Sequence, residues 1–336
     1  MDTTATPTLT SSSGEQLPVK TFAVLGTGAW GTALAQLATE SGITVRSWSR
    51  RGDISLESAV ADADVLLCAI SMKGVAELAS RLKDMGLPSR TILITATKGL
   101  DPKTTKTPSQ LWQEAFPDNP VVVLSGPNLS KEIDRGLPAA TVVASHDAAA
   151  AATVQQIFAV DRFRVYTNAD PLGTELGGTL KNVMAIAVGV CDGLQLGTNA
   201  RSALITRALP EVIRVGTQLG AQPETFYGLS GLGDMLATCT SVLSRNYRVG
   251  YGLAEGKSLE QILQELGSTA EGVNTAHVLV KLANREEIPI PISRQVHRLL
   301  NGAITPLNAV SALMERDLKP EMCDIDEAQG ETMPAA

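Results

Sequence analysis

The sequence of 336 residues has little or nothing of several features that define whole protein classes. Its four cysteines, Cys68, Cys191, Cys239 and Cys323, stand far apart with no CxxC pair, which excludes a disulfide framework and predicts reduced core thiols. No apolar run approaches the ~20 residues that a membrane span requires. The opening residues have neither the basic nor the apolar region of a signal peptide. We therefore expect a cytoplasmic protein without a membrane anchor.

Positive charge is also scarce, with 28 lysines and arginines against 35 acidic residues and a formal net charge of −7. Nucleic acids and anionic membranes select basic surfaces, so neither is expected as a partner. The three histidines, His146, His277 and His297, are isolated in the sequence and form no metal-binding motif. No metal site is predicted, whereas an anionic small molecule can still bind where basic residues gather.

The hydrophobic pattern of the sequence changes near residue 168. From residue 19, short β-branched runs alternate with helical stretches, which predicts a parallel sheet with helices on both faces. Beyond residue 168, apolar residues recur at helical spacing, and Pro210 falls inside one of these helices, where it should kink or split it. The expected fold is α/β, a doubly wound parallel sheet followed by an all-α C-terminal domain. The expected parts are a disordered tail (1–18), the sheet domain (19–167), the helical domain (168–320) and an acidic tail (321–336).

The segment "GTGAWG", residues 26–31, follows the first predicted strand and opens a helix. Gly26 permits a tight turn, Gly28 lets the backbone approach a pyrophosphate, and Gly31 lets helix and strand pack closely. The phosphates then lie at a helix N-terminus, which favours negative charge. A glycine-rich turn without a ligand is the alternative. The context favours a dinucleotide site and thus a Rossmann domain over residues 19–167.

The second predicted strand ends at Ser49, and Arg50 and Arg51 follow it. An NAD-selective site usually has a carboxylate here for the ribose 2′-hydroxyl, whereas arginine suits a 2′-phosphate. No carboxylate appears before Asp53. NADPH is therefore expected as the cofactor, with NADH possible, unless the two arginines form only a solvated basic turn.

Lys98, Gly126 and Asn128 each follow a predicted strand. Ligands of open α/β sheets bind at the carboxyl ends of the strands, so these residues are candidates for substrate binding. Lys98 is suited to binding an anion or polarising a carbonyl group. Taken alone, it would more often be a surface lysine.

In the helical half, "GGTLKN" places Gly177 and Gly178 one helical turn before Lys181, on the same face. Each glycine costs about 1 kcal/mol relative to alanine inside a helix. Two such costs beside one lysine indicate that the space is used, either by a ligand or by a closely packed neighbouring segment.

A second candidate cluster lies further along the chain. Ser244, Arg245 and Asn246 stand at an expected helix start, where a hydroxyl, a guanidinium and an amide suit a phosphate or carboxylate. Asp234, at the end of a glycine-rich turn, is either a helix N-cap or the partner that keeps Lys181 charged and oriented.

With "GTGAWG", "WSRR", "KGL", "SGPNLSKE", "GTELGGTLKN" and "GLSGLGDMLATCTSVLSRN" in this order, residues 19–316 resemble the bacterial NAD(P)-dependent glycerol-3-phosphate dehydrogenases. This resemblance implies interconversion of dihydroxyacetone phosphate and sn-glycerol 3-phosphate for phospholipid synthesis. It also implies a Rossmann domain joined to a helical domain similar to that of 6-phosphogluconate dehydrogenase. A homodimer is expected.

The resemblance further implies a role for each matching residue. Lys181 would transfer the proton. Substrate contacts would come from Lys98, Gly126, Asn128, Asp234, Ser244, Arg245 and Asn246. In addition to the glycines of the turn, Gly26, Gly28 and Gly31, the cofactor would be lined by Trp30, Arg50, Arg51, Lys98, Ser130, Arg245 and Glu271. The chain departs from the family pattern in a short connection after the second strand, in Asn128 for the usual serine or threonine, and in Ser130 for the usual alanine.

Two other functions fit the same pattern. A two-domain reductase acting on a carboxylate, such as a β-hydroxyacid or ketopantoate, would also use lysine and arginine. A non-catalytic nucleotide-sensing module would bind NADPH but would have no need of a proton donor beside a glycine pair.

Overall fold

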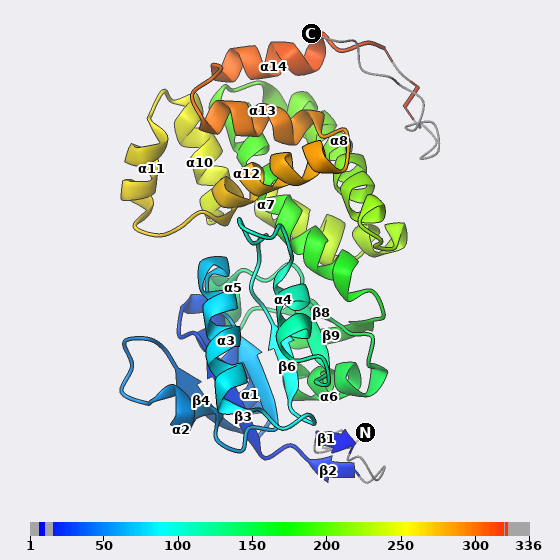
Figure 1. Cartoon of the computed structure of the whole chain (residues 1–336). Coiled ribbons are helices and arrows are strands. Elements are labelled where there is room, and N and C mark those ends of the chain that lie inside the picture. Colours follow the sequence, from blue (N-terminus) through cyan, green and yellow to red (C-terminus); the bar gives the residue numbers. More distant parts are fainter. Residues whose placement is uncertain (1–6, 11–15, 319, 322–336) are drawn as a thin grey trace.

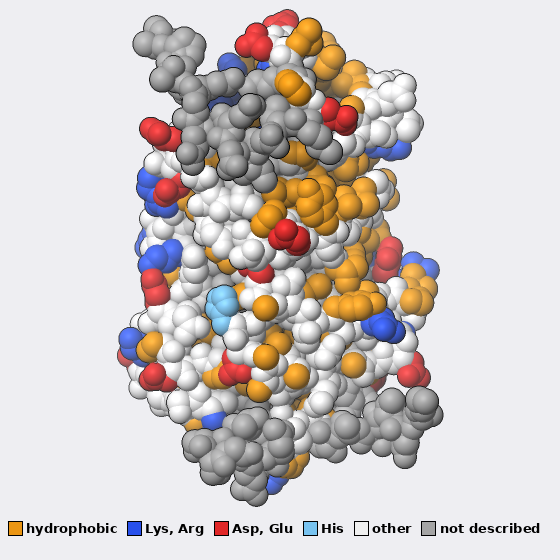
Figure 2. All heavy atoms as spheres, turned by 90° about the vertical axis from the view of Figure 1, so that its right-hand side faces the viewer, with side chains coloured by type: hydrophobic (Ala, Val, Ile, Leu, Met, Phe, Trp, Pro, Cys, Tyr) orange, Lys and Arg blue, Asp and Glu red, His pale blue; other side chains and the backbone are white. Residues whose placement is uncertain are grey.

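The structure is a computed structural model that describes residues 7–10, 16–318 and 320–321. In Figure 1 a sheet with helices on both faces forms one half of the molecule, and helices alone form the other half. Figure 2 shows one face, on which hydrophobic side chains gather over the helical half and lysines and arginines are scattered. In the part of the chain that is described, no helix is long and apolar enough to cross a membrane.

The sheet half contains seven strands among the described residues, in the order β4-β3-β5-β6-β7-β8-β9. The strands are β3 (Thr21–Leu25), β4 (Thr44–Trp48), β5 (Val65–Cys68), β6 (Ile92–Thr95), β7 (Val121–Ser125), β8 (Ala139–Ala144) and β9 (Phe163–Asn168). The chain turns from β3 outward to β4 and then returns to β5 on the other side of β3. This reversal of direction is where open α/β sheets bind ligands at the carboxyl ends of their strands.

The sheet is covered on both faces, as expected. Phe22 and Val24 of β3 lie in a core with α1 and α6, whereas Ala23 and Leu25 lie in a second core with α2, α3 and α4. This alternation follows from the two-residue period of a strand. The helices of this half are α1 (Ala29–Glu40), α2 (Leu56–Val60), the short η1 (Met72–Gly74), α3 (Val75–Met85), α4 (Pro108–Ala115), α5 (Ser130–Asp134) and α6 (Ala148–Phe158).

Two strands differ from the expectation of a purely parallel sheet. β8 runs antiparallel to β7, because the connection between them holds only the five-residue helix α5. Such a helix is about 7.5 Å long, too short to carry the chain back along the sheet for a parallel crossover. β9 was not expected as a strand. Its buried and exposed residues alternate, as at the edge of a sheet, so it lacks the continuous apolar run of the central strands.

The N-terminal segment also differs from the disordered tail expected for residues 1–18. In its described part, β1 (Thr8–Thr10) pairs with β2 (Gln16–Pro18) in an antiparallel hairpin. The hairpin is attached to α6, since Thr153 Oγ1 donates to the carbonyl of Thr8 at 2.6 Å. Residues 1–6 and 11–15 lie outside the described residues, as does the expected acidic tail beyond residue 321.

Only helices follow β9 in the described part of the chain. They are α7 (Pro171–Gly193), α8 (Gly197–Gln218), η2 (Pro223–Tyr227), the π-helix η3 (Leu229–Gly233), α9 (Asp234–Cys239), α10 (Arg245–Ala254), α11 (Leu259–Leu266), α12 (Glu271–Arg285), α13 (Pro291–Leu300) and α14 (Pro306–Met314). α8 continues across Pro210, so of the expected kink or split, the split is wrong. Neighbouring residues Ala208, Val212 and Ile213 are buried in the helical core, and their burial offsets the cost of the proline.

α7 is the central helix of this half, and α10 lies directly against it. A Cβ atom on Gly189 of α7 would overlap the backbone of Tyr247, and one on Gly250 of α10 would overlap the backbone of Ile186. Glycine at both positions therefore lets the two helix backbones touch. This contact holds the N-terminus of α10, with Arg245 and Asn246, beside the middle of α7.

Candidate active site

Three charged side chains from distant parts of the chain meet between the sheet and α7. Lys181 of α7 donates to Asp234 Oδ1 and, at 2.6 Å, to Thr238 Oγ1. Lys98, from the loop after β6, donates to Asp234 Oδ2 at 2.6 Å. Among the described residues the Asp234 carboxylate thus pairs with two ammonium groups and caps no helix. The structure therefore favours the ion-pair alternative over the N-cap.

The cluster is buried, and this burial changes its acid–base properties. Lys181 is 6% exposed and Asp234 is 1% exposed. The pKa of Lys181 is lowered to about 8, chiefly by burial and in smaller part by the Lys98 cation, while Asp234 acts in the opposite direction. A lysine with this pKa can both lose and regain a proton near neutral pH. One carboxylate between two ammonium groups also leaves one positive charge to stabilise a developing oxyanion.

The glycine pair before Lys181 is explained by packing within the protein. A Cβ atom on Gly177 would lie 2.7 Å from the carbonyl oxygen of Ser230. One on Gly178 would overlap Ser125 Oγ and approach Lys98 Cε to 3.5 Å. The neighbouring segments use this space, so packing rather than a ligand accounts for the glycines. The same close approach brings the ends of β6 and β7 next to Lys181.

Arg245 and Glu271 lie close enough to Lys98 and Lys181 for their charges to interact. Burial raises the pKa of Glu271, and the strongest opposing influence is the positive charge of Arg245, followed by Lys98 and Lys181. The guanidinium of Arg245 is exposed and has no hydrogen-bond or ion-pair partner among the described residues. It is therefore available to an anionic ligand beside the cluster of Lys98, Lys181 and Asp234, called the Lys181 cluster below.

Asn246 lies at the junction of three helices. Its amide donates to Asn182 Oδ1 at 2.8 Å, and its oxygen accepts from the backbone N–H of Gly272 at 2.9 Å. Ser244 caps α10 by accepting from the N–H of Tyr247 at 3.2 Å. Both side chains thus serve the fold at the edge of the site, and contact of either one with substrate stays a prediction.

Three residues of this region were not identified from the sequence. Thr238 accepts from Lys181, and the buried atoms Asn182 Nδ2 and Ser125 Oγ find no hydrogen-bond partner among the described residues. Asn182 could have been identified from the sequence, because it directly follows Lys181. Thr238 stands one helical turn after Asp234, a spacing that places both on one face. Nothing in the sequence indicated Ser125.

Gly126 and Asn128 lie in the loop after β7. Asn128 donates to the carbonyl of Ala140 at 3.1 Å and accepts from Thr141 Oγ1 at 2.9 Å. A Cβ atom on Gly126 would lie 3.0 Å from the Cα of Thr141. Both residues are held against β8, so the loop is fixed, and the amide of Asn128 is already engaged.

The glycine-rich turn after β3 fits a dinucleotide. Gly26 has a φ of +115°, and a Cβ atom there would lie 2.5 Å from the carbonyl oxygen of Ala69 at the end of β5. A Cβ atom on Gly31 would overlap the carbonyl of Gly26, whereas nothing lies within 4 Å of that position on Gly28. Gly28 precedes α1 without a side-chain cap. The turn therefore leaves open space at the N-terminus of α1, where a pyrophosphate would fit.

The other expected cofactor residues surround this turn. Arg50 and Arg51 are exposed in the turn after β4, and neither forms an ion pair or hydrogen bond with a described residue. Trp30, in the first turn of α1, packs against the core of the sheet. Ser130 is the first residue of α5 and is half-buried. The two free guanidinium groups have the chemistry that a 2′-phosphate requires.

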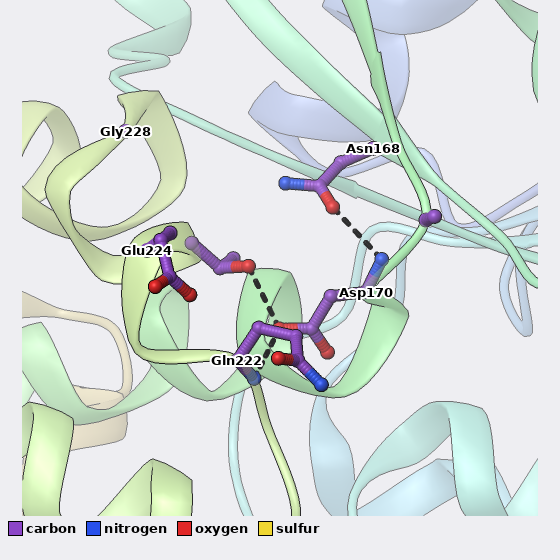
Figure 3. Close-up of a pocket in the computed structure, with 7 residues that line it drawn as sticks. Asn168, Asp170, Gln222, Glu224 and Gly228 are labelled. Carbon is purple, nitrogen blue, oxygen red and sulfur yellow. Dashed lines mark hydrogen bonds between the residues drawn. The ribbon is translucent and has the colours of Figure 1, made fainter.

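A separate cavity of about 510 Å³ lies between the end of β9 and η2 (Figure 3). Its buried carboxylate, Asp170, accepts from the backbone N–H groups of Gly173 and Gln222 and from Thr225 Oγ1. Asn168 accepts from the N–H of Asp170. These contacts join the start of α7 to η2. None of the residues of the Lys181 cluster lines this cavity.

No metal centre is formed by the described residues, since no three histidine, cysteine or acidic side chains gather closely enough. His277 and His297, isolated in the sequence, pack ring against ring with centroids 4.9 Å apart. Cys68, Cys191 and Cys239 are free and buried, and Cys323 lies outside the described residues.

Comparison with known proteins covers almost the whole chain. Family models described as the C-terminus and N-terminus of NAD-dependent glycerol-3-phosphate dehydrogenase match residues 170–311 and, in two segments, residues 21–55 and 52–151. Glycerol-3-phosphate dehydrogenase [NAD(P)+] of Synechocystis sp. is 69% identical over 90% of this chain and 96% of that protein. The enzyme of the same description from Acaryochloris marina is 68% identical over 90% of this chain and 97% of that protein. The crystal structure of glycerol-3-phosphate dehydrogenase from Coxiella burnetii is 34% identical, with a TM-score of 0.85 over 89% of this chain and all of that one.

Proposed function

This chain belongs to the NAD(P)-dependent glycerol-3-phosphate dehydrogenases and interconverts dihydroxyacetone phosphate and sn-glycerol 3-phosphate; from this premise we propose that Lys181 transfers the proton of the reaction. The observation that carries the proposal is the contact of one buried carboxylate, Asp234, with both Lys181 and Lys98. The bound nicotinamide supplies the hydride for the carbon centre. The protein must therefore manage the charge and the proton on the oxygen.

Lys181 is suited to that task by its surroundings. The keto oxygen becomes an alkoxide during reduction, and Lys181 gives it a proton; in the reverse direction Lys181 accepts the proton of the hydroxyl group. Its lowered pKa lets it return to either state near neutral pH. Asp234 and Thr238 hold the ammonium group in place. Lys98 adds a second positive charge, which stabilises the developing oxyanion.

Arg245 is proposed to bind the substrate phosphate. It stands at the first position of α10, where its guanidinium and the helix N-terminus both favour an anion. Binding the phosphate at a distance from the reacting carbon orients that carbon before the reaction. A phosphate site of this kind and the family membership together disfavour the alternative substrates that carry a carboxylate. The buried lysine disfavours a nucleotide sensor.

The cofactor is proposed to lie across the glycine-rich turn, with Arg50 and Arg51 favouring NADPH over NADH. Gly28 offers an open backbone for the pyrophosphate. The ratio of kcat/KM values for the two nucleotides measures this preference. Residues 19–167 would hold the cofactor, and residues 168–320 would supply the proton donor and the phosphate site.

The finer biological setting is also a proposal. We place the enzyme in the cytoplasm, where its product would supply phospholipid synthesis, and we expect a homodimer. Exposed hydrophobic side chains in the helical half, among them Tyr227 (63% exposed) and Val242 (72% exposed), support association through that half. Sedimentation equilibrium of the purified protein would give the mass of the assembly.

The test of the proton-transfer role is the substitution Lys181→Ala. We expect kcat for ketone reduction to fall about 10²- to 10⁴-fold, the usual contribution of a positioned general acid. Added small primary amines should restore part of the rate. NADPH affinity, followed by nucleotide fluorescence, is the control and should stay unchanged. A variant with nearly normal turnover would contradict the role.

A further inference from the structure

The loop between β6 and α4, residues 96–107, carries Lys98 and reaches from the sheet into the helical half (Figure 1). Leu100 in this loop is 1% exposed and belongs to the hydrophobic core of the helical half. Its carbonyl accepts from Asn274 Nδ2 of α12 at 3.2 Å. The position of Lys98 therefore depends on contacts between the two halves.

The loop also holds its own conformation. Asp101 Oδ2 accepts from the N–H and the hydroxyl of Thr104, each at 2.8 Å. Thr105 has a φ of +62°, a conformation that a β-branched residue adopts only under strong constraint. One constraint is visible, since Arg285 of α12 donates to Thr105 Oγ1 at 3.0 Å. These contacts fix the conformation of the loop on the C-terminal side of Lys98.

Two residues on one face of α7 hold the loop, one near its start and the other at the first turn of α4, just beyond its end. Thr179 Oγ1 accepts from the N–H of Gly99, next to Lys98, at 3.1 Å. Glu175 accepts from the N–H of Ser109 at 3.0 Å and from its hydroxyl at 2.5 Å. Glu175 and Thr179 are four residues apart and so share a face of the helix. The helix that carries Lys181 thereby sets the position of Lys98 as well.

A carboxylate at residue 175 makes this contact at a high cost in desolvation free energy. Glu175 is 2% exposed, and no lysine or arginine of the described residues pairs with it. Its partner is the first turn of α4, whose N–H groups and dipole partly offset the buried charge. Burial nevertheless raises the pKa of Glu175 to about 7. An uncharged side chain able to accept the same hydrogen bond would avoid this cost.

We infer that Glu175 is a positioning residue for the dehydrogenase reaction: through Ser109, and together with Thr179, it holds the Lys98 loop against α7 so that Lys98 stays on Asp234. This inference rests on the proposed role of Lys98 at the substrate. Glu175 itself touches neither Lys98 nor Lys181 in any hydrogen bond of the described residues. Its effect is carried by the loop.

The test compares Glu175→Ala, Glu175→Gln and Glu211→Ala in the full-length enzyme. Glu211 is the matched control, because it too is a buried carboxylate bound to the first turn of another helix, through the N–H groups of Ile292 (2.8 Å) and Ser293 (2.9 Å). Its partners lie in α13 and not in the Lys98 loop. Hydrogen exchange over residues 98–109 and steady-state kinetics are measured for each variant.

We expect Glu175→Ala to raise amide exchange over residues 98–109 and to lower kcat/KM, each by about 10- to 100-fold, since a buried hydrogen-bond acceptor is lost. Glu175→Gln should restore both values, because its oxygen can accept from the N–H of Ser109 and its amide can donate to the hydroxyl. Glu211→Ala should lose stability while keeping its loop exchange and kcat/KM.

Three outcomes overturn the inference: unchanged loop exchange in Glu175→Ala, failure of Glu175→Gln to rescue, or an equal loss of kcat/KM in Glu211→Ala. If Glu175→Ala does not fold, Ser109→Ala replaces it and should show the same changes in smaller measure. Lys98→Ala separates the proposed role of Lys98 at the substrate from the proposed effect of Glu175 on the loop. Normal activity in that variant would refute the role of Lys98, whereas the loop exchange of Glu175→Ala would still test the hold on the loop.

Discussion

Asp234 is the residue on which the chemistry of the site depends most directly, because it faces both Lys98 and Lys181. Removing one partner of a buried ion pair typically costs 3–5 kcal/mol, about the effect expected here. The two lysines would then repel one another with no charge between them. The protonation of Lys181 should respond more strongly than its position, since Thr238 still accepts from it.

The substitution Asp234→Asn should therefore shift the pH dependence of ketone reduction. In the proposed mechanism reduction needs protonated Lys181, so the rate should fall as the pH rises through about 8, the pKa of this lysine. Asp234 raises that pKa, and its loss should move the fall in rate to lower pH and reduce kcat. The pH profile of kcat measures the shift. An inflection that stays near pH 8 would show that Asp234 does not control the lysine.

Lys98, Lys181, Asp234 and Arg245 could be named as candidates from residue types, spacing and family resemblance, and the structure brings the first three together, while their roles stay predictions. Ser125 could not be named in this way. The Ser125 hydroxyl lies at the site because the end of β7 approaches α7, and no local sequence pattern predicts that approach. Asp234 could be identified as a candidate, but its choice between cap and ion pair was decided by contacts more than 50 residues apart in the chain.

At the scale of elements, α7 organises the site. It touches the π-helix η3, the end of β7 and α10, and its glycines make these approaches possible. The two glycines before Lys181 face different neighbours. Gly177 faces the backbone of Ser230 and Gly231, which cannot move aside, whereas Gly178 faces the hydroxyl of Ser125, which can rotate.

This difference predicts unequal losses of stability for two neighbouring substitutions. Gly177→Ala should destabilise the protein by about 1–3 kcal/mol, the usual cost of overpacking. Gly178→Ala should change stability by less than about 1 kcal/mol, because the gain in helix propensity is about as large as the cost of turning Ser125. Urea unfolding of both variants measures the difference. Combining Gly178→Ala with Ser125→Ala should remove any remaining cost, and a larger loss for Gly178→Ala than for Gly177→Ala would contradict the packing explanation.

The elements that departed from expectation did so for identifiable reasons. β8 reversed direction because α5 is too short for a crossover, and β9 was overlooked because an edge strand lacks a continuous apolar run. Pro210 did not interrupt α8, since packing on the helical core outweighs a local preference. In each case a tertiary constraint overrode a local signal.

At the scale of the whole molecule, buried ionisable groups link stability to pH. Burial raises the pKa of Glu175 from 4.5 to about 7 and raises that of Glu211. Well below pH 4.5 the carboxyl group of Glu175 is protonated in the folded and unfolded chain alike. As the pH rises from 4.5 toward 7, the unfolded chain releases protons that the folded protein keeps, so the free energy of unfolding falls. Lys181 acts in the opposite sense between about 8 and 10.5, where the folded protein loses its proton first.

These groups should therefore make the protein less stable at pH 7.5 than at pH 5, Glu175 alone by on the order of 2 kcal/mol. Glu175→Gln should lose its share of this decline, because the amide does not titrate. Urea unfolding of wild type and variant at both values of pH gives the comparison. If the two proteins decline in parallel, the carboxyl group of Glu175 does not titrate in this range.

The sequence by itself determined the fold class, the glycine-rich turn and the kinds of residue available for chemistry. These follow from local periodicity and from side-chain types, which act over a few residues. Only the tertiary structure decided which of those residues meet, because ion pairs such as Lys98 with Asp234 and buried contacts such as Glu175 with Ser109 join segments that packing alone brings together. Burial then changed the pKa of Lys181 and Glu175, and burial belongs to the folded molecule as a whole.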